Sequence, residues 1–280
     1  TDMAPATVQR YETSLKHTRD FVWETYHKKD VLLDEVSRQF IEDYEFWLKT
    51  EKKCCHNTAT KYLKNFKKII RIALAKGWMK NDPFLEIRFS LDKVEPDFLE
   101  DSEIQKLISK EIDIPRLSQV RDIFVFCCFT GLAFSDIHGL RKEHIVEDSN
   151  GVRWIRKGRQ KTKIMCNIPL MEIPLKILEK YSTNEYCKKH GVLFPVLCNQ
   201  KMNAYLKELA DICGIKKTLT THVGRHTFAT FALANGVSIE SVAKMLGHTN
   251  VQMTRHYARV LDRTVIREMS QIKMDFHFSM

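Results

Sequence analysis

This 280-residue sequence lacks Cys-x-x-Cys motifs, is poor in glycine and proline, and has no long apolar run. Its eight cysteines include no Cys-x-x-Cys pair, and the adjacent pairs at 54–55 and 127–128 suit neither a disulfide framework nor a zinc site. With 10 glycines and 7 prolines, the chain is neither fibrous nor of low complexity. Its longest apolar run, IFVFCCF at 123–129, is far shorter than the roughly 20 residues of a membrane span. We therefore expect a globular, cytoplasmic protein with reduced thiols and no membrane association.

Charge is unevenly balanced in this chain. Lysine and arginine number 45 against 35 aspartates and glutamates, which gives a net charge of +10 and an isoelectric point near 9.1. Such a balance favours a polyanionic partner, either nucleic acid or an acidic membrane surface. It indicates a class of partner and does not by itself name a function.

Helical periodicity and one irregular stretch divide the chain into two domains. Helices are predicted near 7–26, 37–50 and 57–75, and the proline-marked, mixed-charge stretch at 87–100 is typical of an interdomain linker. The predicted boundaries are residues 1–90 for an α-helical first domain, 91–97 for the linker and 98–280 for the second domain.

The third predicted helix carries a stripe of positive charge. In TATKYLKNFKKIIRIALAK, apolar residues recur at helical spacing, and the basic residues Lys61, Lys64, Lys68 and Arg71 fall on the opposite face. Such a stripe either keeps the helix soluble or contacts phosphates. Beside a net charge of +10, we interpret it as a surface that contacts phosphates.

The second domain mixes helices with a β-hairpin. Helices are predicted at 101–110 and 118–129, followed by the strands GVRWIRKG and TKIMCNIPL, with Lys161 at the start of the second strand. A later helix, which carries His222 and Arg225, is predicted to have Thr221 as its N-cap residue and to end at Asn235-Gly236. The fold class is therefore mainly α with a small antiparallel β-sheet.

The stretch THVGRHTFAT places two histidines and an arginine within five positions. His222 and His226 are four residues apart, as in zinc peptidases, but Val223 stands where such a peptidase needs glutamate. Arg225 on the same helix would also repel a divalent cation. We therefore predict no metal and no cofactor.

Further downstream, MLGHTN supplies His248, and TRHYARV supplies Tyr257 nine residues later. Cleavage of a phosphodiester needs a nucleophile in line with the leaving oxygen, donors for the non-bridging oxygens, and a group that protonates the leaving alkoxide. Tyrosine, arginine and two histidines offer candidates for these tasks, and the hairpin lysine offers one more.

The segment HVGRHTFATFALANGVSIESVAKMLGHTNVQMTRHYARV resembles the second motif box of the tyrosine recombinases, the phage integrase family. The match comprises His-x-x-Arg at His222 and Arg225, Leu-Gly-His at His248, and the tyrosine at Tyr257. FTGLAFSDIHGL resembles the first motif box. The hairpin at Lys161 resembles the β-hairpin that carries a lysine in this family. The sequence of the first box is most similar to that of integrases from conjugative and mobilisable transposons.

The resemblance implies a core-type DNA-binding domain, an α+β catalytic domain and a role for each matched residue. Tyr257 would attack the scissile phosphate, which gives a 3′-phosphotyrosyl link and a free 5′-hydroxyl without metal or ATP. Arg225 would hold the phosphoryl oxygens, and His248 would donate a hydrogen bond to them. His222 would act in proton transfer with the tyrosine, and Lys161 would protonate the leaving oxygen.

For the whole protein, the resemblance implies a site-specific recombinase that integrates or excises a mobile element. Its partner would be double-stranded DNA, bound by a homotetramer across two sites, with a monomer in the absence of DNA and accessory DNA-bending proteins as further expectations. Two alternatives stay open: a strand cutter of the type IB topoisomerase kind, and a DNA-binding protein that kept the fold without the activity.

The chain departs from the family at Ala133, where other members usually carry an arginine. A substitute arginine is expected, and Arg121 ranks first because an arginine within an apolar helix needs an anionic partner; the other interpretation is a salt bridge with Asp122. Arg156 and Arg159 on the hairpin are the next candidates, with Arg141 a weaker fourth. Arg156 and Arg159 also belong to the predicted DNA-binding set.

Two features remain outside these assignments. His226 is predicted to face away from the catalytic residues and to be structural. Apolar residues at helical spacing between 261 and 272 predict a C-terminal tail helix. Such a tail packs either on its own subunit or, as the family resemblance implies, on a neighbouring protomer.

Overall fold

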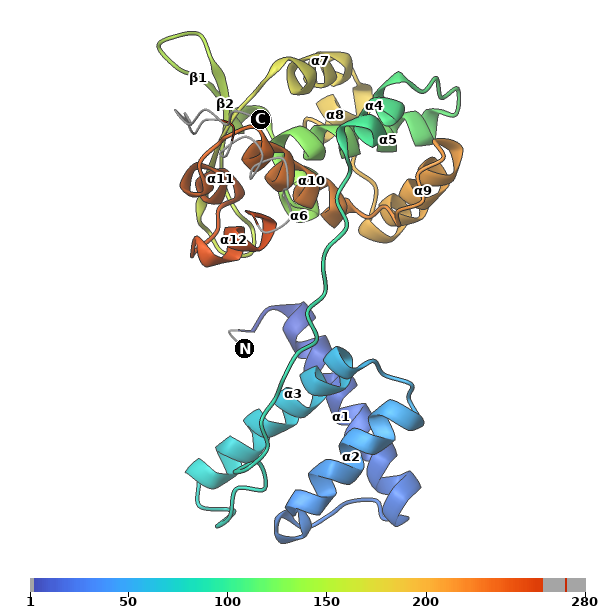
Figure 1. Cartoon of the computed structure of the whole chain (residues 1–280), viewed down its shortest axis with the longest axis vertical. Coiled ribbons are helices and arrows are strands. Elements are labelled where there is room, and N and C mark those ends of the chain that lie inside the picture. The colour runs from blue at the N-terminus through green and yellow to red at the C-terminus, as the bar shows by residue number, and fades with distance from the viewer. Residues whose placement is uncertain (1–2, 259–269, 271–280) are drawn as a thin grey trace, which may run out of the picture. The chain divides into compact units, whose positions relative to one another are not determined.

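The computed structural model describes residues 3–258 and residue 270, so the predicted tail helix at 261–272 lies outside the described residues. The chain divides into two compact units, Thr1–Glu95 and Pro96–Met280, and Figure 1 shows the elements of each. No helix in the described part of the chain is long and apolar enough to span a lipid bilayer. The fold class is mainly α with one small antiparallel sheet, as the sequence predicts.

The first unit is helical and is built around aromatic side chains. Its elements are α1 (Pro5–Tyr26), the 3-10 turn η1 (Leu33–Glu35), α2 (Arg38–Thr50) and α3 (His56–Ala75), which agree closely with the predicted helices. Phe21, Tyr44 and Phe84 are fully buried, and the ring of Tyr44 lies 5.0 Å from that of Phe21. Large rings of this kind bury much apolar surface for a unit of this size.

Helix α3 shows the predicted two faces. Lys61, Lys64, Lys68 and Arg71 are all exposed, so the basic stripe is available to a polyanion. The opposite face is buried at Ala59, Leu63, Ile70 and Ala73. Ile69 belongs to the apolar pattern that was expected to pack, but it is 51% exposed, so it lies at the edge of the buried face.

The second unit combines helices with a three-stranded antiparallel sheet at one side (Figure 1). In chain order its elements are α4 (Asp101–Ser109), α5 (Pro115–Thr130), α6 (Phe134–His138), the 3-10 turn η2 (Lys142–His144), β1 (Ile145–Glu147), β2 (Arg153–Gly158), β3 (Met165–Pro169), α7 (Glu172–Tyr181), α8 (Glu185–His190), α9 (Asn199–Ile212), α10 (Thr221–Ala234), α11 (Ile239–Leu246) and α12 (Gln252–Ala258). The sheet order is β1-β2-β3, and the predicted hairpin is β2-β3. The three-residue strand β1 was not predicted.

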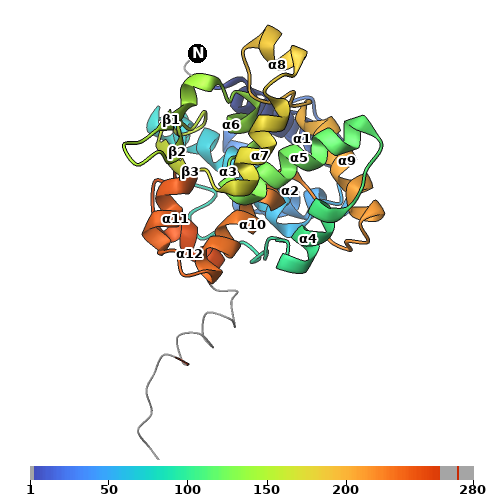
Figure 2. The same cartoon turned by 90° about the horizontal axis from the view of Figure 1, so that it is seen from above.

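Helices α5 and α10 pack against each other at the centre of this unit, and α10, α11 and α12 form a layer beside the sheet (Figure 2). Gly224 lies at the contact between α5 and α10. A Cβ atom at this position would lie 3.2 Å from Cys127 Cβ and 3.2 Å from Phe124 Cε2, so any larger residue would push the helices apart. This glycine therefore holds α10, with His222 and Arg225 on it, close to α5.

The first turn of α10 is fixed to α9. Thr220, rather than the predicted Thr221, is the N-cap residue. The hydroxyl of Thr221 donates to Asn199 Oδ1 at 3.1 Å, and its backbone N–H donates to Asn203 Oδ1 at 2.9 Å. Gly236, with φ of 84°, follows the end of the helix as predicted. Tertiary hydrogen bonds thus replace a local side-chain cap at the start of this helix.

Candidate functional site

The guanidinium of Arg225 is the centre of the candidate site. Arg225 is 2% exposed, and its two terminal nitrogens donate to Gly131 O and Leu246 O, each at 2.7 Å. These carbonyls end α5 and α11, so the packing of the helix ends sets the orientation of the guanidinium. Among the described residues, no carboxylate forms an ion pair with Arg225. The positive charge is therefore held in place without being neutralised.

Burial has a large electrostatic effect on this arginine. Burial is the larger cause and the charge of the nearby Arg159 the next, and together they lower the pKa of Arg225 to about 10. The side chain is still protonated at neutral pH. A buried cation whose partners are neutral carbonyls is suited to an anionic ligand, and the planar fork of arginine matches phosphate oxygens.

His248 is placed beside this centre by a tight helix end. Gly247 has φ of 60°, and a Cβ atom there would lie 2.7 Å from both Arg159 Cδ and Cys166 Sγ, so only glycine fits without displacing them. The Nδ1 atom of His248 forms a hydrogen bond of 2.8 Å with the Thr254 hydroxyl. That bond fixes the ring and leaves Nε2 as the atom that can face a ligand.

Tyr257 on α12 lies against two of the imidazole rings. It is 7% exposed, its ring stacks on His248 at 6.4 Å with an interplanar angle of 9°, and His226 lies 5.3 Å away. Burial raises the pKa of Tyr257, while Arg225 and Arg159 oppose this shift. The tyrosine is therefore a phenol at neutral pH and needs a proton acceptor when its oxygen attacks.

The histidines of this cluster are neutral imidazoles at neutral pH. Burial lowers the pKa of His222, and it lowers those of His226 and His248 to about 4. The rings of His222 and His226 meet edge to face at 4.3 Å. Neutral imidazoles can accept a proton, which is the property required beside a tyrosine nucleophile.

His226 does not face away from the catalytic residues, contrary to the sequence-based expectation. Its ring contacts those of both His222 and Tyr257, and its buried Nδ1 has no hydrogen-bond partner among the described residues. The four-residue spacing from His222 was the signal for this contact, because residues i and i+4 share a helix face.

A carboxylate that sequence reasoning missed completes the site. Asp136 on α6 is 2% exposed, and it accepts hydrogen bonds from Arg159 Nε at 3.4 Å and from the backbone N–H of Gln160 at 2.9 Å. The side chain of Arg159 is 12% exposed. Arg159 was predicted to contact DNA and ranked behind Arg121 as a substitute for the missing arginine, and the structure brings it into this cluster.

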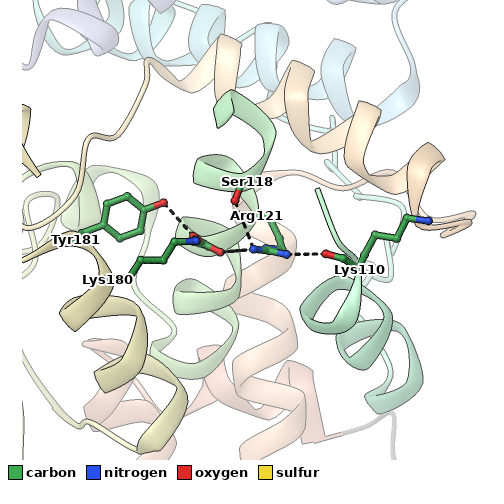
Figure 3. Close-up of polar contacts among 6 residues, drawn as sticks. Lys110, Ser118, Arg121, Lys180 and Tyr181 are labelled. Carbon is green, nitrogen blue, oxygen red and sulfur yellow. Dashed lines mark hydrogen bonds and ion pairs between the residues drawn. The ribbon is translucent and has the colours of Figure 1, made fainter. Parts of the chain in front are cut away.

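Arg121 lies elsewhere in the second unit. Its guanidinium donates to Asp122 at 3.0 Å and to the backbone carbonyl of Lys110 at 2.8 Å, as Figure 3 shows. The same aspartate accepts a hydrogen bond from Tyr181 at 3.0 Å. Arg121 precedes Gly131 by ten residues on α5, which corresponds to about 15 Å along the helix axis. The structure therefore does not bring Arg121 to the cluster, and the salt bridge with Asp122 is its observed role.

The remaining predicted residues are on the surface. Lys161 lies exposed in the turn between β2 and β3, not at the start of a strand, and Arg156 is exposed on β2. The structure does not bring either of them into the buried cluster. In residues 3–258 and 270, no group of three or more His, Cys, Asp or Glu side chains could hold a metal ion.

Comparison with known proteins places the chain in a family. A model of the phage integrase family matches residues 97–264, and a model of the phage integrase SAM-like domain matches residues 1–91. A tyrosine recombinase of Pseudothermotoga lettingae is 30% identical over 244 residues, which are 84% of this chain and 82% of that protein. The tyrosine recombinase XerD of Shewanella oneidensis is 24% identical and covers 95% of this chain and 89% of its own.

Solved structures show the same fold at low sequence identity. A λ integrase dimer bound to a COC′ core site aligns with a TM-score of 0.74 at 18% identity, covering 91% of this chain and 89% of that chain. The Tn1549 transposon integrase in complex with transposon right end DNA aligns with a TM-score of 0.70 at 16% identity, covering 97% and 95%. With these matches and the cluster around Arg225, the chain belongs to the phage integrase family and is a site-specific tyrosine recombinase.

Proposed function

We propose that this recombinase cleaves double-stranded DNA by attack of Tyr257 on a phosphodiester and reseals it to a partner strand, and that it thereby integrates or excises a mobile element. The observation that carries the proposal is the convergence of Tyr257 and His248 with the buried, unneutralised guanidinium of Arg225. Attack forms a 3′-phosphotyrosyl bond and releases a 5′-hydroxyl. Because the bond energy stays in the phosphotyrosyl link, a 5′-hydroxyl from the partner duplex can reverse the step without ATP.

Each side chain has a task that its surroundings support. Arg225 holds the non-bridging oxygens and stabilises the charge that develops on them, and His248 donates a hydrogen bond to the same group. The proposed acceptors of the phenol proton are the neutral imidazoles of His226, whose ring contacts that of Tyr257, and of His222, whose ring contacts that of His226. Lys161, exposed at the hairpin turn, protonates the 5′ oxygen once DNA lies against the site.

DNA is the proposed partner of both units. The λ integrase and the Tn1549 integrase, whose fold this chain shares, were solved with DNA bound. In the first unit, the exposed stripe of α3 supplies phosphate contacts through Lys61, Lys64, Lys68 and Arg71. We propose a homotetramer across two sites as the active assembly, with accessory DNA-bending proteins as further partners.

The test uses a nicked suicide substrate that carries the recombination site. The wild-type chain should form a covalent protein–DNA adduct, and Tyr257→Phe should form none while binding the same DNA with near-normal affinity. Tyr186→Phe is the matched control, because Tyr186 is 51% exposed on α8 and should form the adduct normally. An adduct that persists in Tyr257→Phe and maps to another residue would contradict the proposal.

A further inference from the structure

We propose that Arg159 supplies the second guanidinium of the phosphate site and takes the place of the arginine that position 133 lacks. The proposal rests on the cleavage reaction at Tyr257 described above. It assigns a catalytic task to a hairpin arginine that ranked behind Arg121 in the sequence-based expectation.

The path of the Arg159 side chain points to this role. Arg159 directly follows β2, and its Cδ and Cγ atoms pass Gly247 so closely that a Cβ there would lie 2.7 and 3.0 Å from them. Its Nε reaches Asp136 Oδ2 at 3.4 Å. The side chain thus runs inward, past the residue that precedes His248, and its guanidinium lies among buried groups.

The end of this path coincides with the gap in the first motif box. Ala133 and Asp136 belong to the same short turn, because the backbone N–H of Asp136 donates to Ala133 O at 2.9 Å. An arginine at position 133 would begin from this turn. Asp136 instead holds the guanidinium of Arg159, which enters from the β2-β3 hairpin. Asp136 thereby holds the guanidinium of Arg159 beside position 133, where the family's arginine is missing.

The charges of the cluster require an anion. Burial is the main cause of the lowered pKa values of His222 and His248. The guanidiniums of Arg225 and Arg159 lie close enough to lower these two pKa values as well. Asp136 is the one carboxylate in an ion pair with either guanidinium among the described residues. The formal sum of two cations and one carboxylate is +1. A phosphodiester of charge −1 balances that sum.

The other arginines do not meet these conditions. Arg156 is exposed on β2, and Arg121 is already bound to Asp122 and to the carbonyl of Lys110. Among the described residues, Arg225 is deeply buried and Arg159 largely so, and both lie close enough to Tyr257 to lower its pKa against the effect of burial.

The chemistry needs two such donors. As the Tyr257 oxygen bonds to phosphorus and the bond to the 5′ oxygen breaks, negative charge accumulates on the two non-bridging oxygens. The phenol proton passes to a neutral imidazole, and the leaving oxygen takes a proton from Lys161, so no oxidant or cofactor enters the balance. Arg225 and Arg159 would each neutralise part of the charge, and loss of one such donor typically slows a reaction by about 10²- to 10³-fold.

The experiment compares a phosphodiester with a methylphosphonate at the scissile position, both in suicide DNA. A methylphosphonate replaces one charged oxygen by a neutral methyl group, so it needs less neutralisation. Arg159→Ala should lower the rate of adduct formation on the phosphodiester by about 10²- to 10³-fold. On the methylphosphonate, the same variant should lose about tenfold or less relative to wild type.

Two further variants sharpen the result. Arg153→Ala is the matched control, because Arg153 is an exposed arginine at the other end of β2, and this variant should cleave both substrates as wild type does. Ala133→Arg added to Arg159→Ala should restore part of the phosphodiester rate, since it returns a guanidinium to the same turn.

Each outcome decides the matter. Wild-type cleavage of the phosphodiester by Arg159→Ala would overturn the proposal, and so would an equal loss on both substrates, which would indicate a structural role. If wild type forms no adduct on either substrate, the cleavage reaction itself fails, and this inference fails with it. Adducts in wild type together with a defect confined to the phosphodiester in Arg159→Ala establish the second guanidinium.

Discussion

Acid should destabilise the second unit through its buried histidines before the carboxylates titrate. Burial holds the pKa values of His226 and His248 at about 4, below the ordinary value of 6.5. The folded state then binds fewer protons than the unfolded state between these two values. Stability from this source is therefore complete above pH 6.5 and is lost as the pH falls towards 4.

The size of the effect follows from the two pKa values. At pH 5, each of the two lowered histidine pKa values reduces the free energy of unfolding by at most about 2 kcal/mol relative to a histidine with the ordinary pKa. His226 is 9% exposed and should approach this limit, whereas solvent screens the partly exposed His248 and reduces its share. Ordinary aspartates and glutamates, with pKa values of about 3.9 and 4.3, stay largely ionised at pH 5.

The assay is urea unfolding at pH 7 and pH 5, followed by amide hydrogen exchange in α10 so that only the second unit is measured. His226→Gln should remove up to about 2 kcal/mol of the difference between the two pH values, since it removes one titrating ring. The matched control is His190→Gln, because His190 is exposed at the end of α8 and should leave the difference unchanged. Equal unfolding free energies at pH 7 and pH 5 in wild type would refute the reasoning.

Two other predictions concern the DNA-binding face and the helix end at the site. Replacing Lys64 and Lys68 together by alanine should lower the salt slope of DNA binding by about 2 units at most, roughly one for each lost phosphate contact, measured by titration at several salt concentrations. Gly247→Ala should destabilise the protein by about 1–2 kcal/mol from its positive φ and slow adduct formation as well, because its Cβ would lie 2.7 Å from Arg159 Cδ and Cys166 Sγ. Thermal unfolding and the suicide-substrate assay measure these two effects.

Controls separate specific from general effects in both cases. Alanine at the exposed Lys188 and Lys189 of α8 removes the same charge and should leave the salt slope unchanged; an equal fall would show that net charge, not the stripe on α3, sets it. Gly151→Ala has a comparable φ of 77° with nothing within 4 Å of the added Cβ, so it should cost stability without slowing cleavage. Equal loss of activity in both glycine variants would contradict the role given to the space at Gly247.

Local patterns in the sequence determined the fold class, most helix positions and the central residues of the site. Apolar periodicity reports which face of a segment is buried, and this was enough for the helices and for the β2-β3 hairpin. The spacing of His222, Arg225, His248 and Tyr257 along α10 to α12 sufficed because these helices follow one another in the chain and pack together. The domain boundaries and the residue roles stay predictions.

Only the tertiary structure decided between the candidate arginines. Arg121 lies in an apolar helix and Arg159 in a polar hairpin turn, and the sequence favoured Arg121 because a charge in an apolar helix needs a partner. Periodicity cannot show which carboxylate that partner is. Packing supplied Asp122 to Arg121 from its own helix and Asp136 to Arg159 from another element. Contacts between residues that are distant in the chain depend on how helices and strands pack together, and no local sequence pattern specifies that packing.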